Sequence, residues 1–165
     1  MKGREVVQLE ELIEFVLTHT DEIKTAIVEQ RVDVQKGHTG GGAGHSKVSD
    51  PTALRAIKNI TEIQVVHVQY GAIVAGKMDT VTIKRPEKWL RIERQVREYY
   101  LGNERMAKFY QLKYMKQLDR RQVLDNMKIS KGLYYAMSGD VTRFVMMCAV
   151  AAGLIGPYSK FHAKV

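Results

Sequence analysis

Two helix-start signals lie only eleven residues apart in the second half of the chain. Asp119, with Gln122 three residues later, forms a capping box, and Ser130 is a second N-cap residue. A helix that begins after Asp119 must end within about two turns, because only Lys128 and Ile129 remain for the turn before Ser130. This spacing predicts two short-linked helices, the layout of a helix-turn-helix.

Apolar residues recur at helical spacing over most of the remaining chain, and cap residues separate the stripes. Helices are expected in residues 1–36 with a break near Thr18–Asp21, from Pro51 into the low sixties, from Pro86 to Gly102, and from Asn103 onward. After Ser130 the pattern fits either one long helix or two helices that break at Gly139. The predicted fold class is therefore mainly α, a helical bundle with a C-terminal helix-turn-helix.

The same periodicity predicts which side chains form the core. The expected core residues are Leu9, Leu12, Ile13, Val16 and Leu17; Trp89, Ile92, Val96 and one of Tyr99 and Tyr100; Ala107, Tyr110, Tyr114 and Leu118; Val123, Leu124 and Met127; Tyr134 and Met137; and the stripe Val141, Phe144, Val145, Cys148, Ala149 and Ala152. Cys148 lies within an apolar run without a basic neighbour, so we expect a buried, unreactive thiol.

Residues 64–84 carry a different pattern. Val66, Val68 and Tyr70 alternate with polar residues, and so do Val81 and Ile83. The alternation predicts a small β-hairpin around 66–84 with a turn at 76–79, although the preceding helix could instead continue through Val68.

The composition changes along the chain and suggests its divisions. We expect an N-terminal amphipathic helical segment at 1–36, a Gly-rich flexible loop at 37–50, a helical linker with the possible hairpin at 51–101, a DNA-binding region at 103–155 and a tail at 156–165.

The Gly-rich loop is not a nucleotide-binding phosphate loop. Alignment on Gly44 and Ser46 puts Thr39 where the first glycine belongs and His45 where the lysine belongs. His38 and His45 have no carboxylate or thiol at metal-ligand spacing. We therefore expect a linker here, and neither a metal nor a cofactor.

Positive charge is concentrated around the two helix starts. The net charge is +8, and residues 84–131 contain 14 Lys and Arg against 6 Asp and Glu. Such a segment attracts phosphate. The single cysteine excludes an intrachain disulfide, and no apolar run is long enough to span a membrane. The expected location is the cytoplasm.

A helix-turn-helix presents the first turn of its second helix to the major groove of double-stranded DNA. The candidate base-reading residues are accordingly Ser130, Lys131, Gly132, Leu133 and Tyr135, of which the last four are expected to face outward. The candidate phosphate-binding residues are Arg120, Arg121 and Lys128. Tyr134 is expected to point inward.

Three short motifs resemble phage-encoded transcriptional regulators of the RinA and ArpU type. They are Ser49-Asp50-Pro51-Thr52, Pro86-Glu87-Lys88-Trp89, and Ile129-Ser130-Lys131 followed by Tyr134-Tyr135. The resemblance covers roughly residues 37–155. It implies a sigma-factor-like C-terminal region and a phage or prophage protein that activates late genes in the bacterial host.

The sequence thus predicts a non-enzymatic, sequence-specific DNA-binding regulator. Host RNA polymerase is a possible partner, and the apolar stripe within residues 5–30 is a possible surface for a homo-oligomer. The alternative is a DNA-packaging adaptor similar to a small terminase subunit, which also combines a basic helix-turn-helix with an oligomerising helix. A ring-sized assembly would favour the adaptor.

Overall fold

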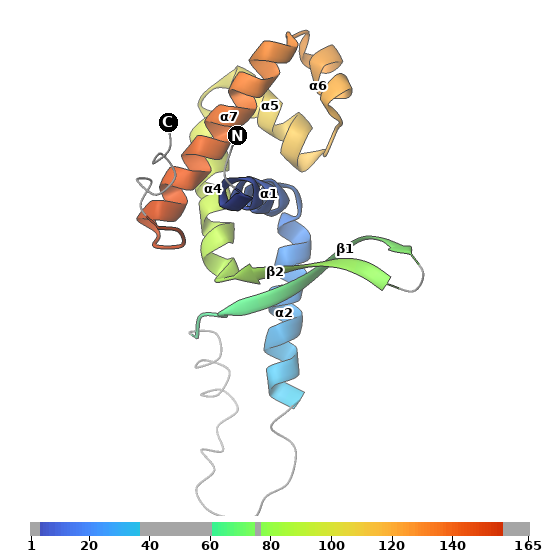
Figure 1. Cartoon of the computed structure of the whole chain (residues 1–165), viewed down its shortest axis with the longest axis vertical. Helices are drawn as coiled ribbons and strands as arrows, with labels where there is room; N and C mark the ends of the chain where they lie inside the picture. The colour runs from blue at the N-terminus through green and yellow to red at the C-terminus, as the bar shows by residue number, and fades with distance from the viewer. Residues whose placement is uncertain (1–3, 37–60, 75–76, 157–165) are drawn as a thin grey trace, which may run out of the picture. The chain divides into compact units, whose positions relative to one another are not determined.

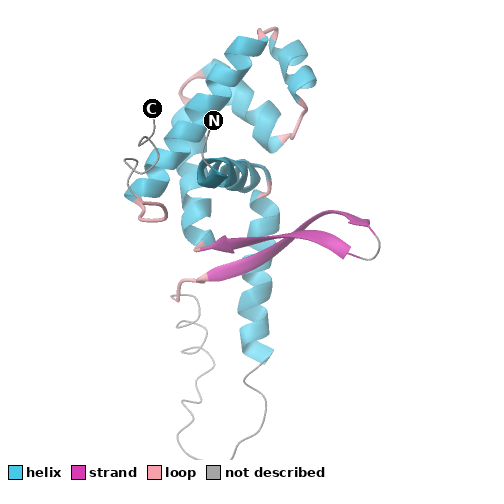
Figure 2. Ribbon diagram, in the orientation of Figure 1, coloured by secondary structure: helices cyan, strands magenta, loops and turns pink. Residues whose placement is uncertain are grey.

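The computed structural model describes residues 4–36, 61–74 and 77–156. Within these ranges the chain is mainly helical with one two-stranded antiparallel sheet, as predicted (Figures 1 and 2). The elements are α1 (Arg4–Thr18), α2 (Thr20–Lys36), β1 (Val65–Val74), β2 (Lys77–Lys84), α4 (Pro86–Leu101), α5 (Glu104–Tyr110), the π-helical segment η1 (Gln111–Met115), α6 (Arg120–Met127) and α7 (Lys131–Ala151). The Gly-rich loop, most of the helix expected from Pro51 and most of the tail lie outside the described residues.

The chain divides into two compact units. Residues 1–20 and 88–165 form the first unit, and residues 21–87 form the second. The N-terminal segment 1–36 therefore contributes α1 to the first unit and nearly all of α2 to the second. The segment divides where the sequence predicts a break, since α1 ends at Thr18 and α2 begins at Thr20.

Most of the predicted apolar positions form the core of the first unit, but several are only half-buried: Leu12, Ala107, Leu118, Leu124, Met127, Phe144, Cys148 and Ala152. On α1 the buried stripe is Leu9, Ile13, Val16 and Leu17; on α4 it is Trp89, Ile92, Val96 and Tyr100; and on α7 it includes Val141, Val145 and Ala149. The stripe of α1 packs against η1 and α7. It is therefore used inside the chain, and the homo-oligomer surface expected within residues 5–30 loses its main apolar component.

One buried carboxylate joins two helices of this core. Glu93 of α4 is 5% exposed, and its Oε1 accepts a hydrogen bond of 3.1 Å from the Tyr110 hydroxyl of α5. Arg97 lies 3.6 Å from the same oxygen and balances its charge. Burial and the neighbouring Glu93 raise the pKa of Tyr110, so this hydroxyl remains a hydrogen-bond donor.

The second unit contains the predicted hairpin. Val66 pairs with Ile83 and Val68 with Val81, and the alternation buries Val66, Val68 and Ile83. A bulge between Tyr70 and Val74 contains Gly71 at φ +79°, a backbone conformation that favours glycine. An ion pair joins Arg31 of α2 to Glu87, which lies in the first turn of α4, three residues after the end of β2.

The turn of the hairpin differs from the prediction. Lys77, Met78 and Asp79 were expected in the turn, but they belong to β2, and Lys77 pairs with Val74. The polar composition of this stretch resembles a turn. Strand pairing nevertheless extends through this stretch, because the apolar pairs fix the register of the two strands.

Helix α7 is a single uninterrupted helix of 21 residues, which decides between the two alternatives left by the sequence. Gly139 lies within it without breaking it, and the helix ends before Gly153, whose φ is +67°. Cys148 was expected to be buried but is only half-buried, and this burial raises the pKa of its thiol. In the ranges described here, no helix is long and apolar enough to cross a membrane.

Candidate nucleic-acid interface

The two helix starts that the sequence predicts are both present. The Asp119 side chain accepts from the Gln122 backbone N–H at 2.9 Å, and the Gln122 side chain accepts from the Asp119 backbone N–H at 3.0 Å. At the second start, Ser130 Oγ accepts from the Leu133 N–H at 3.2 Å. Helix α6 therefore begins at Arg120 and α7 at Lys131, and a short turn joins them (Figure 1).

The turn between α6 and α7 closes around one left-handed residue. Lys128 adopts φ 52° and ψ 48°, and its N–H donates to the Leu124 carbonyl. The Ile129 N–H donates to the same carbonyl at 3.3 Å. This hydrogen-bond pattern, with a left-handed residue, ends a helix. We call the segment from Arg120 to Tyr135 the α6–α7 corner.

The inner side of the corner is firmly anchored. Val123 and Phe109 are completely buried, and Tyr134 and Met137 are nearly so. The Phe109 ring meets the Tyr134 ring edge-to-face, with the two centroids 5.5 Å apart. Burial of Tyr134 raises the pKa of its hydroxyl. Helix α5 therefore packs against the first turn of α7. Tyr134 points inward, as predicted.

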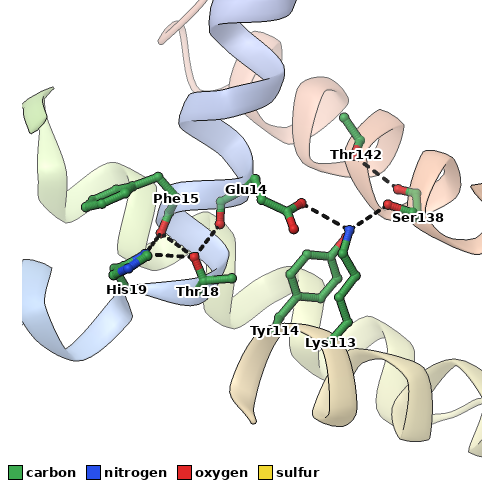
Figure 3. Close-up of polar contacts among 8 residues, drawn as sticks. All are labelled: Glu14, Phe15, Thr18, His19, Lys113, Tyr114, Ser138 and Thr142. Carbon is green, nitrogen blue, oxygen red and sulfur yellow. Dashed lines mark hydrogen bonds and ion pairs between the residues drawn. The ribbon is translucent and has the colours of Figure 1, made fainter. Parts of the chain in front are cut away.

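A second anchor is the ammonium group of Lys113, which Figure 3 shows beside Glu14, Tyr114 and Ser138. The Lys113 side chain is only 10% exposed. Its Nζ lies 3.1 Å from Oε2 of Glu14 on α1 and 2.7 Å from Oγ of Ser138 on α7. It also donates to the Tyr114 hydroxyl at 3.2 Å and lies 5.6 Å from the centre of the Tyr134 ring. One charged group therefore connects α1, η1 and α7 behind the corner.

The three cations expected to bind phosphate are all exposed, but they are not equivalent. Arg121 and Lys128 extend from the surface of α6 and the turn. Arg120 instead donates to the Tyr135 hydroxyl at 2.6 Å, and its guanidinium lies 5.9 Å from the centre of that ring. The structure thus joins one predicted phosphate-binding residue to one predicted base-reading residue.

The predicted base-reading residues separate into two groups. Lys131, Gly132 and Tyr135 are exposed, with Tyr135 at 51%. Ser130 is exposed too, although its hydroxyl caps α7. Leu133 was expected to face outward, but it is half-buried. Exposing a leucine side chain to water costs free energy, and Leu133 lies in the first turn of α7, which is in contact with α6.

Sequence reasoning missed the two anchors. Phe109 lies one position before Tyr110, and the stripe drawn through Ala107 and Tyr110 leaves it out. Both Phe109 and Tyr110 are buried, at the end of α5 where the π-helical η1 begins. Lys113 gives no sequence signal, since a lysine on a helix is normally solvated.

Comparison of the chain with models of known protein families, with curated proteins and with solved structures finds no match. The resemblance to the RinA and ArpU regulators therefore depends on the sequence motifs. Among the described residues, no group of three or more His, Cys, Asp or Glu side chains is arranged to hold a metal ion.

Proposed function

We propose that the α6–α7 corner binds duplex DNA with the first turn of α7 in the major groove. The observation that carries the proposal is the exposure of Lys131, Gly132 and Tyr135 at the start of a rigidly anchored helix. A helix start supplies backbone N–H groups and a partial positive charge, which favour contact with phosphate. Exposed polar and aromatic side chains in the first turn can contact base edges and thymine methyl groups.

The charges around this turn favour the same partner. Arg121, Lys128 and Lys131 are exposed on one segment, and Arg120 lies beside them. Arg120 and Arg121 lie at the start of α6 and Lys131 at the start of α7, where cations oppose the helix dipole, whereas Lys128 lies at the C-terminal end of α6, where the dipole favours a cation. The placement of Arg121 and Lys131 is better explained by an external anion, and a duplex offers a regular row of phosphates.

We infer that the biological role is that of a sequence-specific transcriptional regulator of phage or prophage late genes. The DNA-binding part of this proposal is supported by the corner, and the regulatory part is supported by the resemblance of the three motifs. A regulator of this kind needs discrimination between sites, which three exposed residues on a fixed helix can provide.

The proposal is tested by salt dependence. A duplex selected from a random library is titrated with the protein by fluorescence anisotropy at several salt concentrations. Arg121→Ala is expected to reduce the slope of log affinity against log salt by about 0.9, the value for one phosphate contact. Arg94→Ala removes an arginine of α4 that is also exposed and should leave the slope unchanged. Equal slopes for the wild type and both variants would exclude the corner as the DNA-binding surface.

Gly132 provides an independent prediction, because the fold has no need for a glycine there. A Cβ at this position would meet only Ser130 Oγ, at 4.0 Å. The φ of Gly132 is not positive, so alanine can adopt the same backbone conformation. Alanine should therefore stabilise the exposed helix start by about 0.5–1 kcal/mol. If the bare backbone approaches DNA closely, Gly132→Ala should nevertheless weaken DNA binding by about tenfold, roughly the cost of one lost contact.

Gly139→Ala is the matched control for this prediction. Gly139 also lies within α7, and a Cβ there would meet nothing within 4 Å. This variant should show a similar gain in melting temperature with unchanged DNA affinity. Unchanged affinity in both variants would mean that DNA does not approach the first turn of α7 closely.

A further inference from the structure

An exposed apolar surface lies between α4 and α7, away from the corner. Tyr99 is 64% exposed and Met147 is 62% exposed. The Tyr99 ring packs against the half-buried ring of Phe144, with the two centroids 4.4 Å apart. Phe144 and Met147 are three residues apart and so share one face of α7. We call Tyr99, Phe144 and Met147 the α4–α7 surface.

The charges beside this surface are balanced, in contrast to the corner. Asp140 and Arg143 lie on the same face of α7 as Phe144 and Met147, by helical spacing, and form an ion pair with each other. Two copies of a chain with a net charge of +8 repel each other over most orientations. A face with one acid, one base and an apolar centre is complementary to itself under two-fold symmetry.

The length of α7 relates this surface to the proposed DNA-binding end. Phe144 lies 13 residues after Lys131 in one unbroken helix, which corresponds to about 20 Å along the axis. In a two-fold pair centred at Phe144, with the two α7 helices antiparallel, the two helix starts would be about 40 Å apart, and less if the helices cross at an angle. Successive major grooves on one side of DNA are about 34 Å apart.

We propose that the α4–α7 surface binds a second copy of this chain, and that the resulting two-fold dimer places two α7 starts in successive major grooves. The dimer surface rests on the exposed apolar residues and the balanced charge. The groove spacing rests in addition on the DNA-binding function proposed above. Dimerisation through α7 replaces the surface that the sequence suggested in residues 5–30, whose apolar stripe is buried.

Sedimentation equilibrium of the full chain tests the dimer directly. The wild type is expected to dimerise, and Met147→Glu is expected to raise the dimer dissociation constant by at least about tenfold, because a carboxylate would enter the apolar centre. Tyr99→Glu is the second variant and should act in the same way from α4. Met115→Glu is the matched control, since Met115 is 55% exposed on η1 and should leave the dimer intact.

Circular dichroism spectra identify any variant that fails to fold. If either Met147→Glu or Tyr99→Glu fails to fold, the other one tests the dimer. A wild type that stays monomeric at about 0.1 mM, far above the dissociation constants typical of regulatory dimers, would overturn the proposal. Equal masses for Met147→Glu and Met115→Glu would overturn it too. A ring-sized assembly would do the same and would favour the packaging adaptor.

A second measurement separates the dimer from the DNA-binding proposal. A duplex with two selected half-sites about 10 base pairs apart should bind two chains cooperatively, and one with the half-sites about 15 base pairs apart should not. Met147→Glu should bind single half-sites with wild-type affinity and lose the cooperativity. Specific binding of single chains without cooperativity would overturn the dimer alone, whereas a dimer without DNA affinity would overturn the DNA-binding function alone.

Discussion

Replacing Lys131 and Tyr135 together by alanine is expected to lower discrimination between a selected duplex and random DNA by roughly thirtyfold or more, which corresponds to about 2 kcal/mol. Both side chains are exposed in the first two turns of α7, where the proposed function places base contacts. The ratio of the two affinities, measured by competition at one fixed salt concentration, reports this loss. Affinity for random DNA should fall much less, because Arg121 and Lys128 remain.

The contact between Arg120 and Tyr135 makes this prediction more specific. Tyr135→Phe keeps the ring and removes the hydroxyl that accepts from Arg120 at 2.6 Å. If Arg120 positions the Tyr135 ring, both Tyr135→Phe and Arg120→Ala should reduce discrimination. If Arg120 instead binds phosphate, Arg120→Ala should reduce the salt slope and leave discrimination unchanged.

Lys108→Ala serves as the control for the double variant, because Lys108 is an exposed lysine of α5. It should leave discrimination unchanged. A double variant that distinguishes the two duplexes as well as the wild type does would remove Lys131 and Tyr135 from the base-reading surface.

Phe109→Ala is expected to cause the largest loss of stability, about 3–5 kcal/mol in the free energy of unfolding. The side chain is completely buried, and its ring contacts both Tyr114 and Tyr134. Alanine would leave a cavity directly beneath the start of α7, at the point where α5 supports it. Urea unfolding followed by circular dichroism measures the change.

Met115→Ala is the matched control, since it removes a large apolar side chain that is 55% exposed. It should change the free energy of unfolding by less than about 0.5 kcal/mol. A loss below about 1 kcal/mol for Phe109→Ala would contradict the tight packing beneath the corner.

Local signals made much of this fold predictable. Asp119, Gln122 and Ser130 act within three or four residues of the backbone groups that they cap, so the bounds of α6 and the start of α7 follow from residue type and spacing. The alternation of Val66, Val68 and Ile83 predicts the hairpin for the same reason. The turn of the hairpin was misplaced, because strand pairing extended through residues whose composition is typical of turns.

The candidate site was predictable in position but not in its internal contacts. Lys131, Gly132 and Tyr135 are exposed, as helical spacing predicts, since this spacing also places Tyr134 inward. The partial burial of Leu133 and the bond between Arg120 and Tyr135 depend on how closely α6 approaches α7. That approach is a property of two helices together and leaves no signature in either one.

Residue order and spacing were sufficient for the helices, the caps, the hairpin and the cationic segment, because each depends on neighbours within about one turn or one strand pair. Packing between distant segments settled the rest. It buried the α1 stripe inside the chain, enclosed Lys113 between Glu14 and Ser138, and left Tyr99 and Met147 uncovered. The physical reason is that the sequence of an amphipathic helix determines its apolar face but not what packs against that face. The arrangement of the other helices determines whether the apolar face packs against the same chain or stays exposed for a partner.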